Sequence, residues 1–162
     1  MEVPSLQGLG FEHGVLTQER AKEVAEKRKS IKIGVPKEAS DEERRVAISP
    51  AGVATLVSNG HEVVVGEGAG EAAHFSDTEY AEVGGTIARS SSELYSNSDL
   101  IVKVGPPTDE EVVLMHEKQV LISALHLGDT SPTFLKKLMD LGVTGIGFEF
   151  IRDSEGTLPI VR

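Results

Sequence analysis

The chain has 162 residues, a formal net charge of −10 and no cysteine, with 39% hydrophobic and 26% charged residues. This length and balance are typical of one compact domain with its own core. An acidic surface repels phosphate groups, so we expect no binding to nucleic acid or to an anionic membrane surface. Without cysteine, disulfides, thiolate metal ligands and a cysteine nucleophile are excluded.

The first 30 residues form a separate region in the predicted organisation. Residues 1–16 show no clear periodicity and are interpreted as an arm, and residues 17–29 are predicted to form a helix that Thr17 caps. The N-terminus lacks the apolar segment of a secretory signal, and no apolar run approaches the roughly 20 residues that span a bilayer. We therefore expect a cytoplasmic protein with an arm and helix over 1–30 and one domain over 31–162.

From residue 31 onward, predicted strands and helices alternate. The strands are expected at 31–35, 61–65, 100–104, 120–125 and 143–148. Helix starts are expected at Ser49-Pro50, at the capping-box pairs Ser76 with Glu79, Ser90 with Glu93 and Thr108 with Glu111, and at Ser131-Pro132. Apolar strands that alternate with helices predict an α/β fold, a Rossmann-like parallel sheet with helices on both faces.

Ligands of open parallel sheets bind at the carboxyl ends of the strands, where three residues are candidates. Lys103 lies within the apolar strand predicted over 100–104, and its ammonium could pair with a carboxylate, reach solvent or hold an anionic substrate. His126 follows another strand and could transfer a proton, although a lone histidine is usually structural. Arg45 could form a bidentate fork on a carboxylate, although adjacent arginines most often belong to a solvated loop. Together these groups suit an amino acid or a 2-oxo acid.

Other signals are weak. The stretch GAGEAA at 68–73 has dinucleotide-like glycine spacing, but the following residues favour a turn over a helix, so no cofactor-binding residue is assigned. The remaining histidines lack metal-ligand spacing, and we predict no metal site. The acidic run at 109–111 is interpreted as a helix N-terminus that the dipole favours.

An ordered set of motifs resembles the alanine dehydrogenase and transhydrogenase alpha-subunit family. The set comprises IGVPKE (33–38), RVAISPAGV (45–53), NGHEVVV (59–65), GAG (68–70), FSDTEY (75–80), LIVKV (100–104) and LHLGD (125–129). The resemblance covers about residues 31–162. It implies the first of two Rossmann-like domains, the one on the substrate side.

The resemblance also implies roles for the three candidates. Arg45 would bind the substrate carboxylate, Lys103 would contact the substrate, and His126 would be the catalytic acid or base. The cofactor would be NAD, held mainly by a second domain that lies outside this sequence, so the chain alone is expected to be inactive or nearly so. The partners would be a small 2-oxo acid or amino acid and further copies of the chain in a homo-oligomer.

The branch of the family is indicated by the tail. The Gly-x-Leu-Pro stretch at 156–159 resembles dehydrogenases, and an arginine-isoleucine-serine-arginine stretch typical of transhydrogenase subunits is absent from the sequence. Ala124 stands where dehydrogenases that act on alanine often have tyrosine, which leaves a different or bulkier 2-oxo acid open. The alternatives are a transhydrogenase subunit, a stand-alone binding or assembly module, and a distant relation to the lysine-forming saccharopine dehydrogenases.

Overall fold

A six-stranded parallel sheet forms the centre of the domain. The computed structural model describes residues 29–128 and 132–160. The strands are β1 (Lys32–Val35), β2 (Glu62–Gly66), β3 (Thr86–Ala88), β4 (Leu100–Val102), β5 (Val120–Ser123) and β6 (Thr144–Gly147). The helix predicted over 17–29 lies outside the described residues, apart from its final position.

The strand order β3-β2-β1-β4-β5-β6 creates a switch point between β1 and β4. The chain first builds outward from β1 through β2 to β3, and it then returns to the other side of β1 to continue through β4, β5 and β6. Every pair of neighbouring strands is parallel. All carboxyl ends therefore lie at one edge, and the loops after β1 and β4 diverge there, the arrangement in which open sheets bind ligands.

The helices begin where the capping residues predict. They are α2 (Pro50–Ser58), α3 (Asp77–Glu82), α4 (Ser91–Ser96), α5 (Asp109–Leu114) and α6 (Pro132–Asp140), with the 3-10 turns η1 (Glu71–Ala73) and η2 (Phe148–Phe150). Ser76 and Thr108 form complete capping boxes. Ser90 accepts the amide of Glu93, but the Glu93 carboxylate accepts the Arg89 amide. These short helices are thus fixed by local hydrogen bonds at their first turns.

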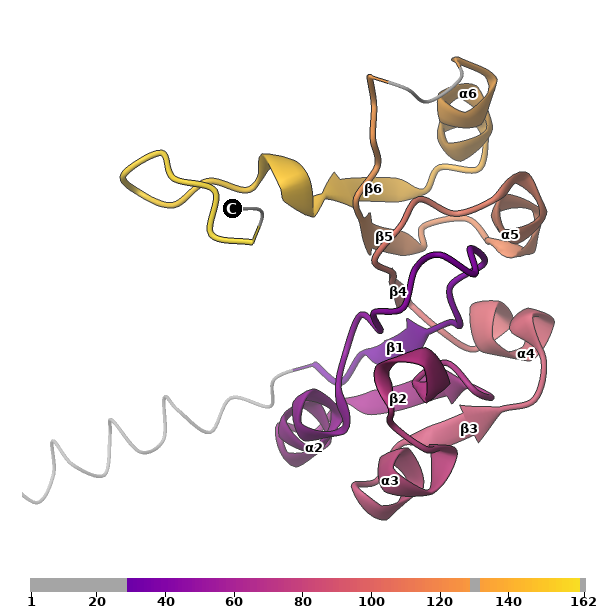
Figure 1. Cartoon of the computed structure of the whole chain (residues 1–162). Helices are drawn as coiled ribbons and strands as arrows, with labels where there is room; N and C mark the ends of the chain where they lie inside the picture. The colour runs from indigo at the N-terminus through magenta and orange to yellow at the C-terminus, as the bar shows by residue number, and fades with distance from the viewer. Residues whose placement is uncertain (1–28, 129–131, 161–162) are drawn as a thin grey trace, which may run out of the picture.

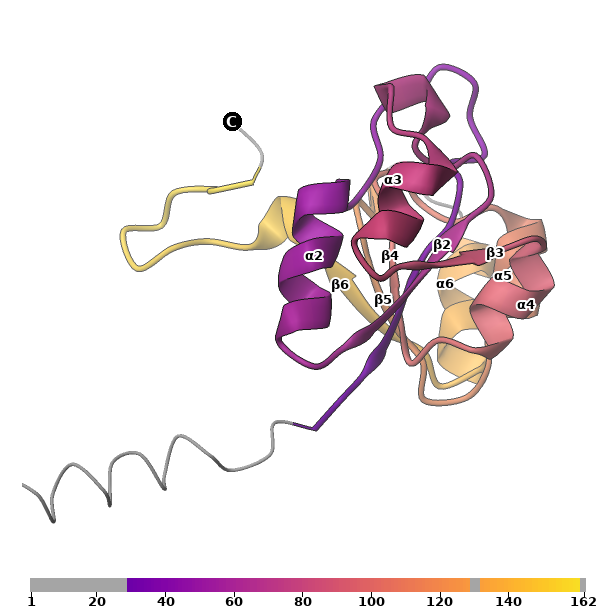
Figure 2. The ribbon, with the colours of Figure 1, turned by 90° about the horizontal axis from the view of Figure 1, so that it is seen from below.

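Helices cover both faces of the sheet, which confirms the predicted α/β class. Figure 2 shows α2 and α3 on one face and α4, α5 and α6 on the other. Each face has its own core: Val53 and Tyr80 pack with strands β1 and β2, and Leu94, Tyr95 and Leu138 belong to the core on the opposite face. The loops at the carboxyl edge therefore start from strands that are packed between two helix layers (Figure 1).

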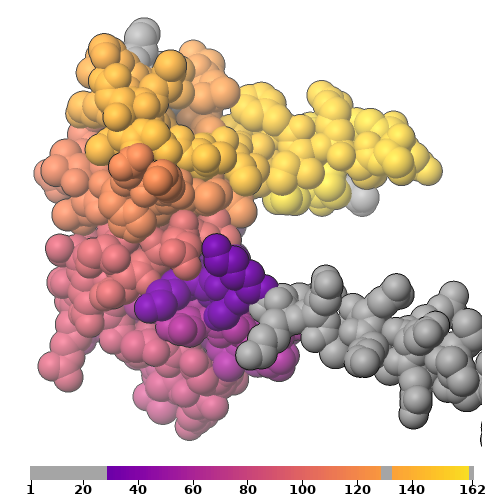
Figure 3. All heavy atoms as spheres, turned by 180° about the vertical axis from the view of Figure 1, so that it is seen from behind, coloured from indigo at the N-terminus to yellow at the C-terminus, as the bar shows by residue number. Residues whose placement is uncertain are grey.

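Two features were not expected from the sequence. The short edge strand β3 has three residues, too few to show a period, and its position is set by pairing with Val64, Val65 and Gly66 of β2. Residues 151–160 form an arm that extends from the body after η2 (Figure 3). In the described residues, no helix has the length and apolarity needed to cross a membrane.

Substitution of Gly34, in the central strand β1, tests the packing between the sheet and α4. A Cβ there would lie 2.5 Å from Ser98 Oγ, 2.8 Å from Ile101 Cδ1 and 2.9 Å from Leu94 Cδ2. We expect Gly34→Ala to lower the free energy of unfolding by about 1–3 kcal/mol because the core is overpacked, measured by urea denaturation. Gly145→Ala is the control, since its nearest contact would be an ordinary 3.5 Å. Equal stability of the two variants would contradict this packing.

Candidate functional site

The three predicted site residues follow three adjacent strands. Arg45 lies in the loop between β1 and α2, Lys103 comes directly after β4, and His126 lies three residues after the end of β5. Because β1, β4 and β5 are neighbours in a parallel sheet, all three side chains start from the same edge. The structure therefore places the candidates after β1 and β4, which flank the switch point, and after the adjacent strand β5. Among the described residues, no hydrogen bond or ion pair joins two of the three.

Lys103 is buried, and its ammonium group is paired with two carboxylates. Its side chain has no exposed surface, and Nζ lies 2.5 Å from Glu111 Oε1 and 3.7 Å from Glu38 Oε2. Of the alternatives that the sequence left open, the structure shows carboxylate pairing. Contact between Lys103 and a substrate remains a prediction, and it requires a rearrangement that exposes Nζ.

Glu111 is fixed in place by its own helix and by α4. It is the third residue of α5, where it completes the capping box: its Oε2 accepts the Thr108 amide at 2.8 Å. Its Oε1 accepts the Tyr95 hydroxyl at 3.0 Å. Burial, followed by the negative charge of Glu111, raises the pKa of Tyr95 well above its ordinary range, so the phenol stays a donor. One carboxylate thus joins a helix cap, a tyrosine and the buried ammonium.

Glu38 bridges the switch point. It follows β1, and its carboxylate accepts the amide of Val104 at 2.7 Å and that of Gly105 at 3.3 Å, both just after β4. It also faces Lys103, and its charge contributes to raising the pKa of Arg45, after the larger effect of Glu43. Glu38 therefore links the two predicted substrate-binding cations electrostatically.

Arg45 is exposed and is engaged by a carboxylate two residues away. Nε donates to Glu43 Oε1 at 2.8 Å and Nη2 donates to Oε2 at 2.6 Å, while the Arg45 amide donates to Oε1 at 2.9 Å. The hydrogen bond from Arg45 lowers the pKa of Glu43 from 4.5 to about 2. The guanidinium thus makes, with a side chain of the same loop, the bidentate contact that a carboxylate ligand would need.

His126 has a strained backbone that Glu149 supports. Its φ of 45° lies in the left-handed region, which is uncommon for a residue other than glycine and often occurs at functional sites. Oε1 of Glu149, in η2, accepts the amides of Leu125 at 2.8 Å and His126 at 2.9 Å. Oε2 of Glu149 is buried and has no hydrogen-bond partner among the described residues. A carboxylate after β6 therefore fixes the backbone that carries the predicted acid or base.

Four glutamates of this edge were missed as site residues. The sequence assigned Glu111 to a helix N-terminus and gave no individual role to Glu38, Glu43 or Glu149. A signal was present for two of them, because a lysine at the end of an apolar strand is rarely buried without a carboxylate. Glu38 follows the neighbouring strand β1, and Glu111 lies in the first turn of α5, the helix that follows β4. For Glu43 and Glu149, no local pattern distinguishes them from solvated acids.

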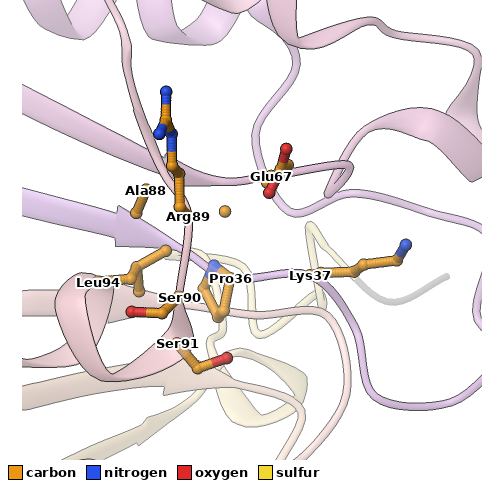
Figure 4. Close-up of a pocket in the computed structure, with 9 residues that line it drawn as sticks. Pro36, Lys37, Glu67, Ala88, Arg89, Ser90, Ser91 and Leu94 are labelled. Carbon is orange, nitrogen blue, oxygen red and sulfur yellow. The ribbon is translucent and has the colours of Figure 1, made fainter.

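A hollow of about 180 Å³ lies beside this site but does not include it. Its lining comes from the ends of β1, β2 and β3 and the start of α4: Pro36, Lys37, Gly66, Glu67, Ala88, Arg89, Ser90, Ser91 and Leu94. Figure 4 shows the side chains of Lys37 and Arg89 pointing in different directions. None of the three predicted residues lines it. Across the described ranges, no group of three or more metal-ligating side chains occurs.

The GAGEAA stretch at 68–73 does not have the form of a dinucleotide-binding loop. The GAGEAA stretch forms only the single 3-10 turn η1, and His74 ends it with a left-handed φ of 64°. A pyrophosphate site of the Rossmann type needs a helix N-terminus at that place. The interpretation of this stretch as a turn is confirmed.

Comparison with known proteins establishes the family. The model of the family described as alanine dehydrogenase/PNT, N-terminal domain, matches residues 34–162. The chain belongs to this family. Its relatives include the alanine dehydrogenases of Methanococcus maripaludis, 39% identical over 129 residues, and Halomonas elongata, 40% identical over 131 residues. These matches cover 80% and 81% of this chain but 34% and 35% of the relatives, so the chain spans about a third of their length.

Solved structures of this family have the same fold. An L-alanine dehydrogenase aligns with a TM-score of 0.76 at 36% identity, covering 80% of this chain and 35% of that one. A transhydrogenase from Sinorhizobium meliloti aligns with a TM-score of 0.70 at 27% identity, covering 76% of this chain and 37% of that one. The resemblance to both branches and the Rossmann-like fold are confirmed.

Removal of the Glu111 charge tests the buried ion pair. We expect Glu111→Gln to lower the free energy of unfolding by about 3 kcal/mol, because the buried ammonium loses its close counter-ion. Tyr95→Phe is the matched control: it removes a hydroxyl that donates to the same oxygen and should cost about 1 kcal/mol. Urea denaturation measures both. An effect of Glu111→Gln no larger than that of Tyr95→Phe would mean that the pair contributes little.

The Glu43–Arg45 ion pair should make the stability of the fold depend on pH in the acidic range. The folded-state pKa of Glu43, about 2, lies below its ordinary value of 4.5. The pair therefore contributes stability above the ordinary value, and the contribution is lost as the pH falls toward 2. A carboxyl-carbon NMR titration should give a pKa near 2 in the wild type and one near the ordinary value in Arg45→Ala. An ordinary pKa in both proteins would show that the pair does not form in solution.

Proposed function

We propose that this chain is the substrate-binding part of an NAD-dependent amino acid dehydrogenase that interconverts an amino acid and its 2-oxo acid. The observation that carries the proposal is the placement of Arg45, Lys103 and His126 after β1, β4 and β5, at one edge of the sheet. The family supports the reaction class, since the relatives named above are alanine dehydrogenases.

Each residue has a role that its chemistry fits. The Arg45 guanidinium, which lies on the surface, would take the substrate carboxylate in a bidentate contact. The Lys103 ammonium would add a second positive charge once its pair with Glu38 opens. His126 would hold or move a proton at the carbon that carries the oxygen or nitrogen of the substrate. Orientation and charge, in this proposal, are what this domain contributes to catalysis.

NAD belongs to the rest of the enzyme in this proposal. The GAGEAA stretch forms a 3-10 turn and lacks the helix N-terminus of a dinucleotide site, and the matched relatives are about three times as long as the aligned region. We therefore expect the chain to bind the substrate weakly and to have no dehydrogenase activity by itself. The assembly into a homo-oligomer and the cytoplasmic location belong to the same proposal.

The transhydrogenase branch is the second candidate, and the structural likeness to the Sinorhizobium meliloti protein supports it. The higher identity to the alanine dehydrogenase structure, 36% against 27%, favours the first candidate. Ala124, which is buried, bears on the substrate side chain, because its small methyl group replaces the aromatic ring expected beside His126. We therefore propose a 2-oxo acid whose side chain is as large as that of pyruvate or larger.

A calorimetric titration with pyruvate and larger 2-oxo acids tests the proposed function. We expect weak saturable binding by the wild type and a loss of roughly tenfold or more in Arg45→Ala, since a charge-assisted contact is removed. Arg44→Ala is the matched control, because Arg44 is the adjacent exposed arginine. Equal binding by Arg45→Ala and Arg44→Ala would contradict the assigned role of Arg45.

A further inference from the structure

The two cations of the site are neutralised by the chain itself, but in different ways. Lys103 is held by Glu111 in the interior, and Arg45 is held by Glu43 at the surface. A 2-oxo acid that uses both cations must therefore replace or share these carboxylates. The surroundings of the two glutamates indicate which of them can leave.

Glu111 has several partners that keep it in place. Its two oxygens accept the Thr108 amide and the Tyr95 hydroxyl in addition to the ammonium of Lys103. Its departure would leave a buried tyrosine hydroxyl and a helix N-terminus without their acceptor, each at a cost comparable to a lost hydrogen bond. Glu111 therefore stays on Lys103 when a ligand enters.

Glu43 has one partner only. In the described part of the chain, it accepts hydrogen bonds from Arg45 alone, through Nε, Nη2 and the backbone amide. The Arg45 side chain is 76% exposed, whereas that of Glu43 is 19% exposed. Because the guanidinium faces solvent, water can replace Glu43 around it, so the guanidinium can leave Glu43 at little cost while the Arg45 amide keeps its hydrogen bond to Oε1.

We propose that Glu43 is a competing carboxylate: it occupies the guanidinium fork of Arg45 until the carboxylate of the 2-oxo acid takes its place. The inference rests on the proposed function, and it adds a residue that sets the affinity of the site. Both oxygens of Glu43 meet the fork side-on, with Nε at 2.8 Å and Nη2 at 2.6 Å, which is the geometry that a substrate carboxylate would adopt.

The exchange has a consequence for ligand choice. One carboxylate replaces another on the same fork, so the gain from Arg45 is the difference between two similar contacts. A ligand without a carboxylate gains no fork contact from displacing Glu43. Glu43 thereby weakens all carboxylate ligands modestly and keeps the fork closed to neutral molecules.

Calorimetric titration of the full 162-residue chain with pyruvate tests the proposal. Glu43→Gln removes the competing charge, and we expect pyruvate to bind about two- to six-fold more tightly, the range that corresponds to an exposed pair of about 0.5–1 kcal/mol. Glu42→Gln is the matched control: it removes the same charge from the adjacent exposed residue, which has no ion pair among the described residues. It should change the affinity by less than Glu43→Gln.

A second measurement follows the exchange itself. In the wild type, saturation with pyruvate should shift the side-chain carboxyl-carbon NMR signal of Glu43, because the carboxylate loses its guanidinium partner. In Arg45→Ala, the same addition should leave that signal unchanged. A role of Glu43 in folding alone would not produce a ligand-dependent shift.

The outcomes separate the two hypotheses. Pyruvate affinity that is unchanged or weaker in Glu43→Gln, while Arg45→Ala still abolishes binding, would overturn the exchange and leave the proposed function standing. Pyruvate binding to neither the wild type nor Glu43→Gln would overturn both. Binding that appears only in Glu43→Gln would support the exchange in its strongest form.

Discussion

The buried ammonium of Lys103 is the constraint around which the carboxyl edge of the sheet is arranged. A lysine whose side chain has no exposed surface needs a close carboxylate to stay charged. Glu111 supplies it from α5 and Glu38 supplies a second from the loop after β1. The switch point, the start of α5 and the buried Tyr95 are thereby joined, so a change at one of them should be felt at the others.

This arrangement shows how one residue can have a local and a tertiary role. Thr108 and Glu111 form a capping box that the sequence predicts without reference to the rest of the molecule. One Glu111 oxygen completes that cap, and the other receives Tyr95 and Lys103. The capping box therefore places the Glu111 carboxylate beside Lys103 at the end of β4, so a local capping motif forms part of the candidate site.

The layers of the fold could be predicted from the sequence because they depend on local patterns, and the same patterns place the candidate site residues at strand ends, where their roles stay predictions. Apolar runs and capping residues gave the strands and helix starts, except for β3, whose three residues carry no period and whose place depends on pairing with β2. Strand ends gave Arg45, Lys103 and His126. The choice between a paired and a free Lys103 could not be made, because it depends on Glu38 and Glu111, which are 65 and 8 positions away in the sequence.

The charges at the carboxyl edge of the sheet imply that an anionic ligand of the proposed kind would have to displace a carboxylate of the chain from Arg45 or Lys103. The cations Arg45 and Lys103 are outnumbered by the carboxylates Glu38, Glu43 and Glu111, which lie against them. An anionic substrate of the proposed kind would therefore meet a site whose positive charge is already balanced. Exchange at an exposed pair costs little, whereas exchange in the interior would leave buried groups unpaired. In the proposed function, the substrate carboxylate would therefore engage Arg45 first, and Lys103 would become available only when its contact with Glu38, the longer of its two, opens.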